Sequence, residues 1–502
     1  MKKAICLFLF ASAAGALAAG IRLAGPFADG MVLQRGRKVP VWGTATPGAK
    51  VKVAFAGAET CGTADGNGRW RVDIPAMPHS AESRTLTASE DGGSAVTVAD
   101  VLVGDVWFVS GQSNTEFPLC SVNPHFSDRN GAAIAQKTHM PLVRFCCQSS
   151  YKMSLEPKTE VSMEVKWRKF NPKNLVSPSF SAMACYFAIN VHGATGIPLG
   201  LVGAYWGGTG IDSWTPREGT ASRADLKDIL QWKSSLTWDG KNPKSLWLHH
   251  NRVVDQPHLL WNEMVNPWCP YAMRGLLWYQ GCTNAREYDR YVSKMHALYH
   301  GWSTKFENPD MKFYFVQLAP WGFADIAKMQ EEQARYEREE PNSAMAVISD
   351  LGNLRDIHPN EKGTVGLRLA LHALKRDYGF TDIQDNSPTL KSWKIENGAF
   401  RLEFNDSKRL YLYNGDFSDV TPFEIAGEDG VFKPAKIANL HVTEHKNGRR
   451  EFRGNIDGNF LLVKAEGVDK PRRLRYLYSR PWLATVYNEV NLPLGAFHID
   501  AP

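Results

Sequence analysis

The pattern of apolar and polar positions changes twice along the chain. From about residue 21 to residue 100, apolar and polar side chains alternate over short segments bounded by turn residues, which is typical of β-strands. Short strands without a long helical pattern predict an N-terminal β-sandwich-like unit. The expected strands are residues 31–34, 39–42, 51–55 and 70–74, with a hairpin turn at 65–68.

In the middle of the chain, apolar runs of strand length alternate with longer stretches of helical period. Such runs, separated by helices, are typical of parallel strands that are covered on both faces. Five runs predict an α/β unit with a flavodoxin-like, doubly wound sheet. The expected strands are residues 105–109, 199–205, 273–278, 312–318 and 344–349, and the expected helices include 180–191, 288–306 and 362–377.

One polar, tryptophan-bearing segment, residues 217–257, interrupts this alternation. It is interpreted either as an insertion near the site or as a surface excursion. From about residue 387 the β-signals return, with turns at Asn397-Gly398, Asn414-Gly415 and Asn447-Gly448. The pattern therefore predicts four parts, which are a signal peptide, an N-terminal β-unit, a central α/β unit and a C-terminal β-unit. Their expected bounds are 1–18, 19–100, 101–386 and 387–502.

The first eighteen residues have the pattern of a bacterial signal peptide. Lys2 and Lys3 precede a short apolar stretch, and Ala16-Leu-Ala18 supplies a small-x-small cleavage signal. Cys6 has no small-residue lipobox before it, which argues against a lipid anchor. No other apolar stretch reaches the roughly 18 residues of a membrane span. The expectation is a soluble exported protein, either periplasmic or secreted.

Charge and cysteine content narrow the classes of ligand. Removal of two lysines with the signal peptide lowers the formal charge from +6 to +4, which is too weak and dispersed to indicate nucleic-acid binding.

The chain has 8 cysteines, and seven remain after loss of Cys6, so at least one thiol of a monomer stays free in an oxidising compartment. No pair has the spacing of a zinc site, and neither a metal nor a cofactor is expected. Oligomeric state is not predicted.

The most informative segment runs from Val106 to Asn114, where an apolar stretch stops at Ser-Gly-Gln-Ser-Asn. This pattern predicts a buried strand that ends in a tight turn, with Gly111 allowing the bend and Ser113 raised above the sheet edge. Open α/β sheets keep their chemistry at that edge. The alternative for Ser113 alone is a helix cap.

Three further strand ends carry polar side chains. Trp206 to Trp214 offers glycines that let backbone N–H groups approach a ligand, and Trp278 to Ala285 offers two side-chain amides. Residues 350–359 hold carboxylates and a histidine. Each has a structural alternative, since Gly207-Gly208 suits a turn, Gln280 a buried amide and His358 a core imidazole. Together with Ser113 they supply the parts of acyl transfer.

With these motifs the chain resembles the sialate O-acetylesterase family of the SGNH hydrolase superfamily. The resembling segments are residues 27–35, 103–107, 110–114, 206–209, 278–281, 315–320, 356–359, 423–428 and 487–489. The resemblance implies an SGNH-type sheet, Ser113 as nucleophile and His358 as general base. It also implies an oxyanion hole made by the N–H groups of Ser113 and Gly208 and the side chain of Gln280, with Asn284 as a competing donor.

Two positions depart from that family pattern. Many relatives carry an acidic residue where this chain has Cys282, so any contact of that carboxylate is absent. The superfamily usually places its acid three residues before the histidine, and here Arg355 occupies that position. Asp356 is the nearest candidate to orient His358. Asp350, or a Ser–His dyad assisted by a backbone carbonyl, are the alternatives.

The function implied is that of an exported serine esterase that removes O-acetyl groups from a sugar or glycan, with sialic acid as the expected sugar. The alternatives are an esterase acting on acetylated xylan or another glycan, and a non-catalytic carbohydrate-binding protein on the same fold. The joint presence of Ser113, Gln280 and His358 favours the enzyme.

Overall fold

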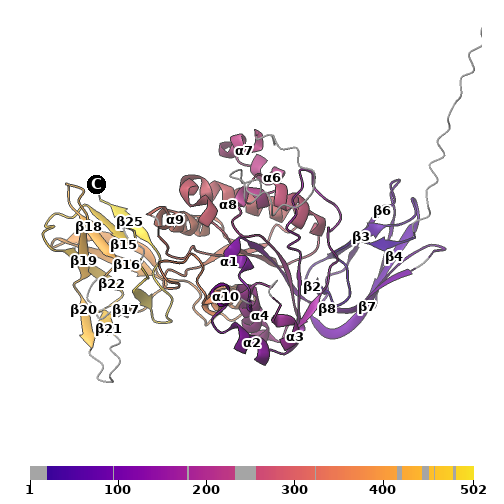
Figure 1. Ribbon diagram of the computed structural model, residues 1–502, viewed down its shortest axis with the longest axis horizontal. Helices are drawn as coiled ribbons and strands as arrows, with labels where there is room; N and C mark the ends of the chain where they lie inside the picture. The colour runs from indigo at the N-terminus through magenta and orange to yellow at the C-terminus, as the bar shows by residue number, and fades with distance from the viewer. Residues whose placement is uncertain are drawn as a thin grey trace, which may run out of the picture.

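The computed structural model describes residues 20–93, 95–121, 123–177, 180–231, 256–322, 324–414, 421–443, 452–456, 458–478 and 482–501. The predicted signal peptide, most of the segment 217–257 and the turn at Asn447-Gly448 lie outside these residues, as does Gly415 of the turn at Asn414. Figure 1 shows a mixed α/β protein in which an N-terminal β-unit, a central α/β unit and a C-terminal β-unit follow one another along the long axis.

The central unit is built on parallel strands in the order β9-β11-β8-β12-β13-β14, with β10 antiparallel at the edge beside β9. All five expected strands are present, and every residue of β11 and β12 is buried. Strands β9 and β10 were not among the predicted ones. The bounds are β8 Ala95–Gly111, β9 Met140–Cys147, β10 Arg168–Phe170, β11 Leu199–Tyr205, β12 Gly275–Tyr279, β13 Lys312–Val316 and β14 Ser343–Ala346.

Helices cover both faces of this sheet (Figure 1). The three expected helices form as α4, α8 and α10, and α9 is an additional one. On one side α4 and α10 pack closely, because a Cβ at Gly366 would lie only 2.6 Å from the carbonyl oxygen of Met183. The other side carries α6, α8 and α9. The bounds are α4 Ala182–Thr195, α6 Arg217–Ala221, α8 Tyr288–Lys305, α9 Ala324–Glu339 and α10 Lys362–Asp377.

The N-terminal β-unit is joined to the central sheet by strand β8, which is 17 residues long. The first part of β8 pairs with β7 and β2, and its last residues pair with β11 and β12. The predicted boundary at 100–101 therefore falls inside one continuous strand, and one hydrophobic core runs through both units. The bounds are β1 Arg22–Leu23, β2 Val32–Gln34, β3 Val39–Thr44, β4 Lys50–Phe55, β5 Ala58–Thr63, β6 Arg69–Ile74 and β7 Ser80–Glu90.

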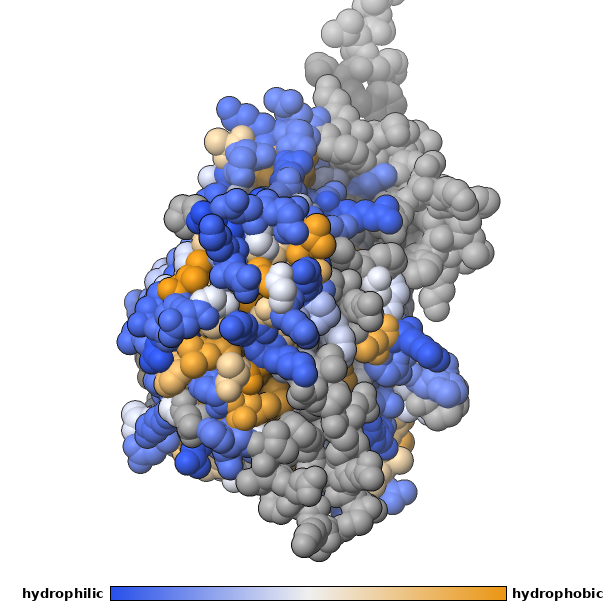
Figure 2. Space-filling model, turned by 90° about the vertical axis from the view of Figure 1, so that its left-hand side faces the viewer, coloured by the Kyte–Doolittle hydropathy of each residue, from blue (hydrophilic) through white to orange (hydrophobic). Residues whose placement is uncertain are grey.

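The C-terminal unit has two antiparallel sheets, in the orders β15-β16-β22-β19-β18-β23-β25 and β20-β21-β17-β24, around a core of its own. The predicted turn at Asn397-Gly398 joins β15 to β16 with positive φ angles of 50° and 71°, as a type I′ hairpin requires. Figure 2 shows mostly hydrophilic side chains on the outward end of this unit, with smaller apolar patches between them. The bounds are β15 Thr389–Glu396, β16 Ala399–Asn405, β17 Leu410–Asn414, β18 Phe423–Ala426, β19 Lys433–Ile437, β20 Leu440–Thr443, β21 Phe452–Ile456, β22 Phe460–Ala465, β23 Arg473–Tyr476, β24 Val486–Asn488 and β25 Phe497–Asp500.

Two further observations concern the predicted compartment. Within the described part of the chain, no helix is both long and apolar enough to cross a membrane. The seven cysteines that follow Cys6 are all free thiols, so none of the disulfides allowed by the sequence forms in this structure.

Candidate active site

Ser113 stands where the sequence predicts it, at the turn after the central strand. Strand β8 ends at Gly111, and Ser113 opens the short helix α1, Ser113–Glu116. Gly111 has a φ of 140°, and a Cβ there would lie 2.4 Å from both the Thr115 hydroxyl and the Tyr279 carbonyl oxygen. Only glycine fits this position, because the backbone turns sharply against the neighbouring strand.

The imidazole of His358 lies next to this serine. Its Nε2 is 2.8 Å from the Oγ of Ser113, although 245 positions separate the two residues. The loop that carries His358 lies between β14 and α10, and its ring packs edge-on against Phe126 at 5.4 Å. A hydroxyl within hydrogen-bond distance of an imidazole is the arrangement of an activated nucleophile and its base.

Asp356 is the carboxylate beside His358. Its Oδ1 accepts the backbone N–H of His358 at 2.9 Å and lies 3.4 Å from Nδ1 of the ring, a distance longer than an ordinary hydrogen bond. Asp350, the alternative acid, is held by both terminal nitrogens of Arg368 at 2.6 and 2.7 Å. Its two oxygens are therefore committed to a different partner.

The loop after β11 approaches Ser113 from the other side. The N–H of Gly207 donates to Oε2 of Glu116 at 2.6 Å, and a Cβ at Gly207 would lie 3.2 Å from the Cβ of Ser113. Gly208 follows in the left-handed region with a φ of 74°. Among the described residues, the N–H groups of Ser113 and Gly208 have no hydrogen-bond acceptor. They are therefore available to an anionic oxygen.

Gln280 is engaged differently from the prediction. Its Nε2 donates to the Thr209 carbonyl at 3.0 Å and to Oδ1 of Asn284 at 2.8 Å, while its Oε1 accepts from Tyr291 at 2.7 Å. A fully buried amide must satisfy its donors within the protein, and here both are taken. The geometry thus gives Gln280 a supporting place behind the site and not that of a free oxyanion donor.

Asn284, the competing donor, belongs to the same network. Its Nδ2 donates to Glu287 at 3.0 Å, and its Oδ1 also accepts the N–H of Ile211 at 3.1 Å. The network therefore braces the loop after β11 against the loop after β12.

Lys362 and Glu116 are site residues that the sequence reasoning missed. Lys362 is the first residue of α10 and is completely buried, with its Nζ 2.5 Å from Oδ1 of Asn114. Burial lowers the pKa of Lys362 to about 7. Burial also lowers the pKa of His358, the charge of Lys362 lowers it further, and Asp356 opposes both effects. His358 is therefore biased toward the neutral form that a general base requires.

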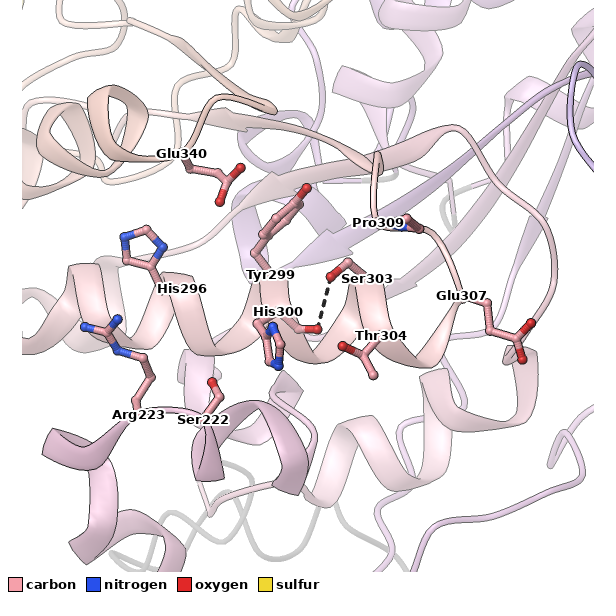
Figure 3. A pocket seen from close by; sticks show the side chains of 10 residues that line it. All are labelled: Ser222, Arg223, His296, Tyr299, His300, Ser303, Thr304, Glu307, Pro309 and Glu340. Atoms are coloured by element: carbon pink, nitrogen blue, oxygen red, sulfur yellow. Dashed lines mark hydrogen bonds between the residues drawn. The ribbon is translucent and has the colours of Figure 1, made fainter.

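A separate surface hollow of 680 Å³ lies along α8 (Figure 3). His296 and His300 lie one turn apart on this helix, and Tyr299 and Glu340 face the same space. None of Ser113, Gly208 and His358 lines it. No group of three or more potential metal-ligating side chains occurs in the parts of the chain that the structure describes.

Comparison with known proteins gives a consistent family assignment. The family model described as carbohydrate esterase, sialic acid-specific acetylesterase, matches residues 103–375, a segment that contains Ser113, Gly208 and His358. The human sialate O-acetylesterase is 28% identical over 409 residues, covering 74% of this chain and 73% of that protein. The mouse sialate O-acetylesterase is 27% identical over 471 residues, covering 84% and 85%.

A solved structure extends this similarity to nearly the whole chain. A carbohydrate acetylesterase from Xanthomonas citri superposes with a TM-score of 0.78 at 30% identity, covering 95% of this chain and 99% of that one. The likeness therefore includes both β-units as well as the segment that carries the Ser113–His358 pair.

Proposed function

Because the chain belongs to the sialic acid-specific acetylesterase family of carbohydrate esterases, we propose that it hydrolyses O-acetyl esters of sugars and that O-acetylated sialic acid is its substrate. The observation that carries the mechanism is the 2.8 Å contact between Ser113 Oγ and His358 Nε2.

In the first half of the reaction, Ser113 Oγ attacks the acetyl carbonyl carbon while His358 takes the hydroxyl proton. The N–H groups of Ser113 and Gly208 bind the oxygen that becomes negative in the tetrahedral intermediate. The C–O bond to the sugar then breaks, and His358 returns its proton to the departing sugar oxygen. The products are the deacetylated sugar and an acetyl ester on Ser113.

In the second half, His358 removes a proton from a water molecule that attacks the acetyl-enzyme. Collapse of this second intermediate breaks the bond between the acyl carbon and Ser113 Oγ. His358 gives its proton to Oγ, which restores the Ser113 hydroxyl as acetic acid is released. Asp356 assists by holding the His358 backbone and by favouring the imidazolium form that appears in each half. At 3.4 Å from Nδ1 it acts as a weaker partner than a directly hydrogen-bonded acid would.

The proposal also includes the fold of the central sheet, the domain bounds and the compartment of the protein. With the outermost parallel strand β9 left out of the count, the strand order β11-β8-β12-β13-β14 corresponds to 2-1-3-4-5 in chain order, which supports an SGNH-type, flavodoxin-like sheet. We assign residues 19–100 and 387–502 to flanking β-domains and 101–386 to the catalytic domain. The pattern of residues 1–18 supports export to the periplasm or the medium.

The test is acetate release from an O-acetylated sialic acid and from acetylated xylan, using the wild type, Ser113→Ala and Ser110→Ala. Ser110 is a buried serine near the end of strand β8, just before the turn that carries Ser113. Its hydroxyl has no partner among the described residues, and it serves as the matched control. We expect Ser113→Ala to lower kcat by at least about 10⁴-fold and Ser110→Ala to keep full activity. Full activity of Ser113→Ala would overturn the serine mechanism, whereas faster release from xylan would overturn only the choice of sugar.

A further inference from the structure

Lys362 is a buried cation near the Ser113–His358 pair, since its Nζ contacts Asn114, the residue that follows Ser113. Its side chain is 0% exposed, and its Nζ lies 4.6 Å from the centroid of the Phe117 ring and 5.3 Å from that of Tyr279. In the described part of the chain it forms no ion pair with a carboxylate. A buried lysine without an ionic partner is energetically costly, so its presence here requires an explanation.

The role follows from its hydrogen-bond partner. Lys362 Nζ donates to Oδ1 of Asn114 at 2.5 Å, and Nδ2 of Asn114 donates to the carbonyl of Ile357 at 3.0 Å. Asn114 adjoins Ser113, and Ile357 adjoins His358. One side-chain amide therefore connects the turn of the nucleophile to the loop of the base, and Lys362 fixes which way that amide faces.

We propose that Lys362 is a positioning residue for the acetyl-transfer reaction, which orients Asn114 to hold the His358 loop against Ser113 and opposes protonation of His358 by its charge. This inference rests on the proposed function, because it assigns Lys362 a part in the same Ser113–His358 chemistry. It adds a residue that touches neither the substrate nor the reacting atoms.

The effect of the Lys362 charge on His358 depends on every charged or titratable group near the ammonium. The backbone N–H of Lys362 donates to Oδ2 of Asp128 at 2.9 Å, so this carboxylate faces the start of α10 without reaching Nζ. Because the pKa of Lys362 is about 7, its ammonium is charged over the acidic range in which His358 would gain a proton. The groups that act on Lys362 or His358 are Asp128, Tyr279, Cys282 and Asp356.

The first variant is Lys362→Met, which keeps most of the unbranched side chain and removes the charged amino group. We expect the acid limb of kcat/KM for 4-nitrophenyl acetate to move up by about one pH unit, because His358 loses a nearby repelling charge. We also expect kcat at pH 8 to fall about 10-fold as Asn114 loses its anchor. If Lys362 had only a structural role, its replacement would lower activity without moving the acid limb of kcat/KM.

The second variant, Cys282→Asp, leaves Lys362 in place and sets a carboxylate beside it. The acid limb of kcat/KM should again move to higher pH, since the added negative charge offsets the positive charge of the Lys362 ammonium. Lys375→Met is the matched control, because this lysine lies on the same helix but pairs with Asp385 at 2.9 Å, and the limb should stay unchanged.

The titration of His358 is also followed directly by NMR of ¹³C-labelled histidine, with the resonance assigned through His358→Asn. An unchanged His358 titration in both Lys362→Met and Cys282→Asp would overturn the inference even if the wild type is an active esterase. A wild type that releases no acetate would overturn the proposed function instead. The NMR titration would then still decide whether Lys362 controls the protonation of His358.

Discussion

The carboxylate of Glu116 accepts the backbone N–H of Gly207 at 2.6 Å and ties the helix of the nucleophile to the loop after β11. The other oxygen of Glu116 accepts the hydroxyl of Tyr151. Because Gly208 follows directly, this contact sets the distance between the two free N–H groups that we assign to the oxyanion. The active-site geometry thus depends on a carboxylate that takes no part in the chemistry.

Glu116→Gln tests that dependence. An amide has one accepting oxygen and one donating nitrogen, so it cannot accept from both Gly207 and Tyr151. We expect kcat to fall about 10-fold with little change in KM, because the donor at Gly208 is displaced in the transition state. Steady-state kinetics on an aryl acetate measure this. Tyr151→Phe, which removes one of the two hydrogen bonds, should have the smaller effect, and an equal loss would argue against the role of Gly207.

Gly207→Ala should misplace the same loop by steric contact. The new Cβ would lie 3.1 Å from Oε2 of Glu116 and 3.2 Å from Cβ of Ser113. We expect kcat to fall by about 10- to 100-fold, since displacements near 1 Å have effects of that size.

Gly193→Ala provides the comparison for that variant. Gly193 lies on the exposed side of α4 with no atom within 4 Å of its added Cβ. Activity should be unchanged, and the free energy of unfolding should rise by about 0.5–1 kcal/mol. Loss of activity in this variant would indicate that α4 tolerates fewer substitutions than the open space around Gly193 suggests.

Asp356→Asn is expected to affect both rate and pH dependence. Burial and the charge of Lys362 lower the pKa of His358, and the negative charge of Asp356 raises it by less. Removal of Asp356 should therefore move the acid limb of kcat/KM further below pH 6.5. This is opposite to the shift expected for Lys362→Met. Because the carboxylate is 3.4 Å from Nδ1, we expect kcat to fall by about 10- to 100-fold, less than for a directly bonded triad acid. Asp350→Asn should instead lower Tm through loss of the Arg368 pair, and a larger kcat effect there would reassign the acid.

The contact of the C-terminal unit with α9 should depend on pH. Nδ1 of His498 on β25 lies 2.8 Å from Oε2 of Glu331, and this hydrogen bond raises the pKa of His498. A raised folded-state pKa gives stability that is present below the unfolded value near 6.5 and is lost as pH rises through the folded value. The Tm difference between wild type and His498→Gln should therefore be largest at pH 5 and vanish at pH 9. Its size is about 1 kcal/mol or less, because the pair is half-exposed.

The sequence was most informative where local pattern and function coincide. The apolar run before Gly111 predicts both a strand and a turn, and these place Ser113 from local information alone. The hairpin at Asn397-Gly398 is predictable for the same reason, since only two residues decide it. By contrast, α9 is rich in charged residues, and its apolar stripe is too narrow to stand out from a solvated segment.

Contacts between distant segments could not be inferred in the same way. A lysine at the start of a helix ordinarily faces water. Lys362 is buried instead by residues that lie far away in the chain, among them Asn114, which is 248 positions away. The role of Gln280 also depends on residues that are distant in the chain. An amide at a strand end suits an oxyanion donor and a buried brace equally well, and the positions of Thr209 and Tyr291 decide between the two.

The continuity of β8 has a consequence for how the molecule unfolds. The strand that ends at the Ser113 turn begins in the N-terminal sheet, so loss of pairing with β7 would free the backbone that sets the register of the nucleophile. Calorimetry should accordingly show one cooperative transition for residues 20–386, with acetylesterase activity lost in the same step. The C-terminal unit, with its separate core, is free to melt at another temperature.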